Sequence, residues 1–118
     1  MYKRQARHND PLVAKALRYM HENIGQHITI GSLRDHLGVT TPHLLAHFRD
    51  QLNTTPAAEL RRLRIERAKQ QLGSTQVPMK TLANRCGFSN IFHFMTTFKQ
   101  LTGMSVCEYR RSAVDAKS

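Results

Sequence analysis

Apolar residues recur three and four positions apart in several segments of the chain, which is the spacing of one face of an α-helix. The first of these segments spans residues 10–24 and carries the apolar positions Leu12, Ala16, Tyr19 and Met20. Asp10 is a good capping residue and Pro11 suits a first turn, so a helix is expected to begin here and to close at Gly25. The same period continues along the chain and predicts an all-α fold.

A short helix, a glycine and a longer helix are predicted next. The short helix spans residues 30–37, and Gly38 after it tolerates the positive φ of a sharp turn. Thr40 or Thr41 caps the longer helix, and Pro42 fits its first turn. The apolar positions of the longer helix are Leu44, Leu45 and Phe48.

This pattern occurs twice. The stretch CGFSNIFHFMTTFKQLTG at residues 86–103 has much the same shape as LGVTTPHLLAHFRDQLN at residues 37–53. Gly87 corresponds to Gly38, and one extra residue after the glycine brings Phe98 into correspondence with Phe48, fifty positions earlier. Two copies without further repeats argue against a solenoid.

A longer helix is predicted between the two copies, from Pro56 to about Leu72. Seventeen residues give a rod of roughly 25 Å at ~1.5 Å per residue. Its apolar stripe contains Leu60, Leu63, Ala68 and Leu72. Its positive charge comes from Arg61, Arg62, Arg64, Arg67 and Lys69, which we expect to be partly solvated.

Each copy predicts a helix-turn-helix arrangement, whose second helix can enter the ~12 Å wide major groove of DNA. The residues expected to hold the helices together are Leu33, Leu37, Val39, Leu44 and Phe48 in the first copy, and Leu82, Cys86, Phe88, Phe94 and Phe98 in the second. The aromatic residues of the second copy are therefore mostly core. A connecting helix would set both reading helices against one DNA face. If the spacing between the two reading helices differs from the ~34 Å DNA repeat, binding would bend the duplex.

The charge balance favours an anionic partner. Eighteen Lys and Arg residues stand against eight Asp and Glu residues, a formal net charge of +10. Nucleic acid is the commonest explanation for such an excess, and a membrane surface is the second. The alternative is a basic, solvated surface without an anionic partner. No apolar run approaches the ~20 residues of a membrane span, and no secretory signal is recognisable, so a cytoplasmic location is expected.

The sequence lacks the motifs of catalysis or metal binding. Cys86 and Cys107 are not closely paired, and both are expected to be small buried hydrophobic residues. His43 and His47 have a metal-binding spacing but no third ligand nearby, so surface or packing roles are favoured. Without a phosphate loop, paired carboxylates or an activated cysteine, we expect neither an enzyme nor a cofactor.

Three stretches carry a family resemblance: ITIGSLRDHLGVTTPHLLAHFRDQLNTTP, LRRLRIERAKQQL and MKTLANRCGFSNIFHFMTTFKQLTGMSVCEYRR. Together they cover roughly residues 11–112 and resemble the C-terminal DNA-binding domain of AraC/XylS-type bacterial transcription regulators. The resemblance implies seven helices, with helix-turn-helix subdomains at about 30–52 and 78–101 and a linker helix at about 56–72. It also implies binding to double-stranded promoter DNA, contact with RNA polymerase and a nucleoid-associated location.

In most members of that family a ligand-sensing domain precedes this one. Residues 1–10 are therefore either the end of an interdomain linker or the start of a stand-alone member, and residues 113–118 are expected to be a flexible tail. A sensing or dimerisation domain is expected in a longer parent chain.

The resemblance also indicates which residues read the bases. The family's reading positions fall on Pro42, Leu45 and Ala46 in the first copy and on Ile91, Phe92, His93 and Thr96 in the second. Most of these side chains are apolar, where the family often has Arg, Gln or Ser. Readout is therefore expected to depend on thymine methyl groups, DNA shape and polar neighbours. The polar candidates are Thr41, His43, Asn90, His93 and Thr96. The alternative is that Leu45, Ile91 and Phe92 pack against protein.

Phosphate contacts are expected from two pairs of residues. Thr40 and Ser89 begin the reading helices, where a hydroxyl and free backbone N–H groups suit an anion. Arg49 and Lys99 follow the core phenylalanine in each copy. The alternative function is a helical protein-interaction module that contacts the transcription machinery.

Overall fold

The computed structural model describes residues 10–73 and 77–117, and these form helices without a strand. The helices are α1 (Pro11–Glu22), α2 (Ile30–Leu37), α3 (Thr41–Leu52), α4 (Pro56–Leu72), α5 (Met79–Arg85), α6 (Ile91–Thr102) and α7 (Val106–Lys117). The predicted all-α fold of seven helices is confirmed. The described residues divide into two compact units, the first made of 10–23 and 28–60, the second of 24–27, 61–73 and 77–117.

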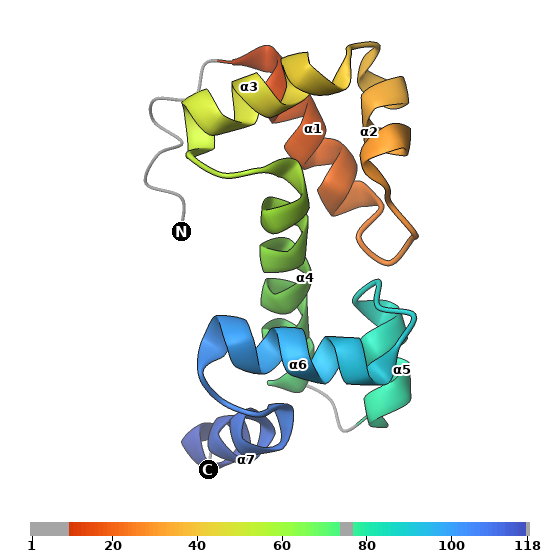
Figure 1. Cartoon of the computed structure of the whole chain (residues 1–118). Helices are drawn as coiled ribbons and strands as arrows, with labels where there is room; N and C mark the ends of the chain where they lie inside the picture. The colour runs from red at the N-terminus through yellow and green to blue at the C-terminus, as the bar shows by residue number, and fades with distance from the viewer. Residues whose placement is uncertain (1–9, 74–76, 118) are drawn as a thin grey trace. The chain divides into compact units, whose positions relative to one another are not determined.

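In the first unit, α1, α2 and α3 pack against one another (Figure 1). Its buried apolar side chains include Val13, Ala16, Met20, Ile28, Leu33, Leu44, Phe48 and Leu52. The buried face of α1 is centred on Val13, whereas Leu12 and Tyr19 are only half-buried at its edges. The helix also ends at Glu22 rather than at Gly25, because Asn23 caps it.

Side-chain caps set the helix-turn-helix of the first unit. Thr29 and Ser32 each accept a hydrogen bond from the other's backbone N–H, at 2.9 and 3.0 Å, and so fix the start of α2. Gly38 ends α2 in the left-handed region, with φ of +69°, as the sequence predicts. Thr40 then caps α3 by accepting from the backbone N–H of His43 at 3.3 Å.

In the second unit, α6 has α5 near its N-terminal end and α7 near its C-terminal end (Figure 1). Its core includes Ile65, Ala68 and Leu72 of α4 together with Leu82, Cys86, Phe88, Phe94, Phe98 and Val106. Neighbouring rings lie at centroid distances of 5.2 Å for Phe88 and Phe94 and 6.1 Å for Phe94 and Phe98. These three aromatic residues are core, as predicted.

The turn between α5 and α6 depends on Gly87. Its φ is +88°, and an added Cβ would overlap the carbonyl oxygen of Ile24 and lie 2.6 Å from Nε of Arg64. Nη2 of Arg64 donates to the carbonyl oxygen of Gln26 at 3.0 Å, which holds residues 24–27 against this turn. Only glycine fits both the backbone conformation and the space available.

The structure also differs from the sequence-based expectations at Leu37, Val39 and Cys107 and at the end of α7. Leu37 and Val39 are half-buried rather than buried. Cys107 is exposed, because its neighbour Val106 takes the inward position at the start of α7. The backbone is helical to Lys117, so α7 continues through most of residues 113–118, where a flexible tail is expected. The sequence there contains alanine and lysine but no glycine or proline that would end a helix.

Candidate nucleic-acid interface

Helix α3 turns its predicted DNA-contacting residues outward. Its inward face is made by Leu44, Phe48 and Leu52, which are buried. The exposed candidates are Thr40, Pro42, His43, Ala46 and Arg49, and the half-buried ones are Thr41 and Leu45. The half-burial of Leu45 leaves part of its side chain accessible at the surface.

The start of α3 has a basic neighbour that the sequence did not suggest. Nη1 of Arg34, on α2, donates to Oγ1 of Thr41 at 3.2 Å. This contact brings a guanidinium to the N-terminus of the candidate reading helix, where anions are favoured. Comparing the two copies of the repeat could not reveal the contact of Arg34, because the residue of the second copy that corresponds to Arg34 is Ala83.

The two histidines of α3 have packing and hydrogen-bonding roles. The ring centroids of His43 and His47 are 4.3 Å apart, and Nδ1 of His47 lies 2.5 Å from Oδ2 of Asp10. Burial acts to raise the pKa of Asp10, but its hydrogen bonds with His47 and with the backbone of Leu12 and Val13 bring the pKa below its ordinary value. Within residues 10–73 and 77–117, no cluster of three or more His, Cys, Asp or Glu residues suited to a metal ion occurs.

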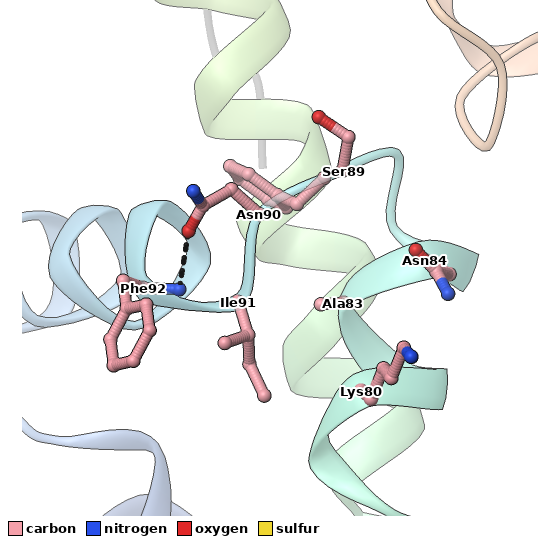
Figure 2. Close-up of a pocket in the computed structure, with 8 residues that line it drawn as sticks. Lys80, Ala83, Asn84, Ser89, Asn90, Ile91 and Phe92 are labelled. Atoms are coloured by element: carbon pink, nitrogen blue, oxygen red, sulfur yellow. Dashed lines mark hydrogen bonds between the residues drawn. The ribbon is translucent and has the colours of Figure 1, made fainter.

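Asn90 caps the start of α6, so this residue has a structural role besides its predicted contact with DNA bases. Oδ1 of Asn90 accepts from the backbone N–H groups of Phe92 at 2.8 Å and His93 at 3.1 Å. Figure 2 shows the first of these bonds. The sequence suggested that the helix begins at Ser89. Ser89 is exposed and precedes the cap, and the helix begins after Asn90. The reason is that an asparagine side chain reaches two backbone N–H groups here.

The outer face of α6 carries most of the remaining candidates. Phe94, Thr97 and Phe98 are buried on the inner face. Phe92, His93, Thr96 and Lys99 are exposed, and Ile91 is half-buried. Met95 is exposed on the same face, and the sequence reasoning missed it. The fifty-residue correspondence of the two copies could have found it, because it pairs Met95 with the candidate Leu45.

Two grooves bring these residues together. The first groove has a volume of about 300 Å³ and is lined by Ser89, Asn90, Ile91 and Phe92 together with α5 residues that include Lys80 (Figure 2). Thr96 and Lys99 line another of about 500 Å³ with Met95 and the start of α7. Most of the predicted residues of the second copy therefore line one or the other of two grooves along α6.

Two arginines of α4 bind backbone carbonyl groups of their own unit. Arg64 binds Gln26, and Nε of Arg67 donates to the carbonyl oxygen of Arg85 at 3.0 Å. Burial lowers the pKa of Arg64 below its ordinary value. These contacts give the two arginines a role in holding the second unit together, which the sequence alone did not predict.

The short helix, turn and longer helix that occur in each unit define a helix-turn-helix protein. None of the described helices combines the length and apolar character that a membrane span requires. A family model described as "Helix-turn-helix domain" matches residues 33–112. The chain belongs to the AraC/XylS-type family of helix-turn-helix domains found in bacterial transcription regulators. This is a family of regulators and not of enzymes, which confirms the expectation that the chain is not an enzyme.

Individual relatives agree with this assignment. The chain is 34% identical over 97 residues to the raffinose operon transcriptional regulatory protein RafR of Pediococcus pentosaceus, covering 82% of this chain and 35% of that protein. It therefore spans about a third of that relative's length. The C-terminal domain of AraT, a response regulator from Geobacillus stearothermophilus, has a TM-score of 0.85 at 29% identity, covering 89% of this chain and 88% of that one. A transcriptional regulator with an AraC-type DNA-binding domain, from Chromobacterium violaceum, has a TM-score of 0.81 at 27% identity, covering 87% and 92%.

Proposed function

We propose that the chain binds double-stranded promoter DNA, with α3 and α6 entering successive major grooves, and thereby regulates bacterial transcription. The observation that carries this proposal is that both helices bury one face and turn the predicted reading residues outward. The net charge of +10 supports it, because phosphate neutralisation supplies much of protein–DNA affinity.

Base readout is assigned to the outer faces of these helices. In the first unit the proposed base-facing residues are Thr41, Pro42, His43, Leu45 and Ala46. In the second unit they are Asn90, Ile91, Phe92, His93 and Thr96. The exposure of Phe92 supports its proposed role over the alternative that it packs against protein.

Phosphate binding is assigned to Thr40, Arg49, Ser89 and Lys99, all of which are exposed. Arg49→Ala or Lys99→Ala should weaken binding to every duplex alike and reduce the slope of log K against log salt by about one. Fluorescence anisotropy at several salt concentrations, on a selected duplex and on an unrelated one, would measure both effects. A loss confined to the selected duplex would contradict the assignment.

The whole regulator has further proposed properties. DNA bending follows if the two reading helices do not match the DNA repeat, and circular-permutation gel shifts without position dependence would exclude it. Contact with RNA polymerase, a sensing or dimerisation domain in a longer parent chain and a nucleoid-associated cytoplasmic location are also proposed. They rest on the family and on the fraction of RafR that the chain spans.

A further inference from the structure

Helix α6 exposes large apolar side chains on the face opposite its core. Phe92 is 75% exposed and Met95 is 37% exposed. They lie three residues apart, so they are neighbours on the helix surface, and Phe94 and Phe98 lie on the other side. An exposed phenylalanine adjoining a second large apolar residue is unfavourable in water and indicates a contact surface.

Two polar residues at the start of α6, Asn90 and His93, also have contacts within the fold. Oδ1 of Asn90 caps the helix, and the ring of His93 lies edge-on to Phe88 at a centroid distance of 5.5 Å. The apolar pair is therefore the most prominent feature of this end of the helix.

The surroundings of the pair are positively charged. Lys99 lies one turn beyond Met95, and Lys80 lines the same groove as Phe92. The sequence of α6, IFHFMTTFKQLT, contains no acidic residue. The matching partner is therefore apolar where it meets Phe92 and Met95 and negatively charged around that point.

The DNA major groove has this combination at thymine, whose C5-methyl group projects into the groove between two phosphate backbones. We propose that Phe92 and Met95 form a thymine-methyl contact that determines sequence specificity in the second unit. This inference rests on the proposed DNA-binding function, and it adds Met95 to the residues that read bases. It predicts that the site bound by α6 requires the thymine methyl groups as well as the A·T base pairs.

The test replaces thymine by deoxyuridine, which removes only the C5-methyl group. The probe is the duplex that the chain recovers most often from a random pool, with its thymines replaced one at a time. Each contacted methyl group that is lost should weaken binding about fourfold, the factor expected for one buried carbon. The same series is measured with Phe92→Ala and Met95→Ala. Leu101→Ala is the control, because Leu101 is 51% exposed on the same helix but half a turn away from Phe92.

Two results together support the proposal. First, one or two thymine positions show this loss with the wild-type chain. Second, at those positions Phe92→Ala or Met95→Ala binds the thymine and deoxyuridine duplexes equally, whereas Leu101→Ala still binds the deoxyuridine duplex more weakly. It is overturned if the wild-type chain binds all deoxyuridine duplexes as well as the parent duplex. It is equally overturned if the variants retain the full methyl effect, since the apolar pair would then serve another partner such as a protein. Recovery of no duplex from the pool would instead contradict the proposed DNA-binding function.

Discussion

Among the described glycines, Gly87 is the one whose replacement the structure constrains most. Alanine there would adopt a positive φ and would also overlap the carbonyl oxygen of Ile24. Gly38 provides a matched control, because its φ is +69° but nothing lies within 4 Å of an added Cβ. We expect Gly38→Ala to destabilise the fold by about 1 kcal/mol and Gly87→Ala by about 2 kcal/mol or more.

Thermal denaturation followed by circular dichroism would compare the two glycine variants. Equal midpoints for both would show that the close approach of residues 24–27 to the turn does not occur in solution.

The two cysteines should differ sharply in reactivity. Cys86 is fully buried, and this burial raises the pKa of its thiol to about 11, although Arg67 and Arg85 act in the opposite direction. Cys107 is exposed. At pH 8 a thiol reagent should therefore label one cysteine per folded chain quickly, and both only in denaturant.

Cys107→Ser should abolish the fast labelling. A fast reaction that persists in this variant would mean that Cys86 is accessible and that the packing of the second unit is looser than the structure indicates.

At the scale of the helix, Asp10 joins the start of α1 to α3. It caps α1 through Leu12 and Val13 and pairs with His47. Asp10→Ala should therefore destabilise the first unit by about 1 kcal/mol or more, because both contacts are lost. Asp10→Asn is the matched control, since asparagine caps helices equally well and removes only the charge, and it should cost clearly less.

The contribution of Asp10 should also depend on pH. Its pKa is lowered by folding, so the stabilisation is complete above the ordinary aspartate pKa of about 3.9 and is lost as the pH falls through the lowered value. The Asp10→Asn variant should lack this part of the acid-induced loss of folding stability. Urea unfolding from pH 3 to pH 7 would measure it, and parallel curves for wild type and Asp10→Asn would contradict the role of the carboxylate.

The helices themselves could largely be predicted from the sequence, because their ends are marked by local residues. Asp10 with Pro11, and Gly38 followed by Thr40, fix three helix ends through contacts that span only a few positions. The outward faces of α3 and α6 followed from the same period, once the core phenylalanines were assigned.

The contacts between distant segments could not be predicted in this way. His47 meets Asp10 across 37 positions, and Arg64 meets Gln26 across 38. Neither pair has a local signal, because histidine and arginine occur equally on solvated helix faces. The exposure of Cys107 was missed for a related reason, since the helical period alone does not decide which of two adjacent residues, Val106 or Cys107, faces the core.

At the scale of the whole molecule, the repeat gives one chain two helix-turn-helix units, and α4 contributes residues to both. Regulators with a single reading helix per subunit bind as dimers to half-sites one DNA turn apart. If both units read DNA, as proposed, one chain needs no second subunit to recognise two grooves. A single chain should therefore occupy an asymmetric site without dimerising.

Hydroxyl-radical footprinting of the chain on its selected duplex tests this claim most directly, with the protein-to-DNA ratio in the complex measured alongside. The expected result is one chain per duplex and two protected segments whose centres lie about 10 base pairs apart. A single protected segment, or two chains per duplex, would contradict the account of α3 and α6 as two reading helices of one DNA-binding chain.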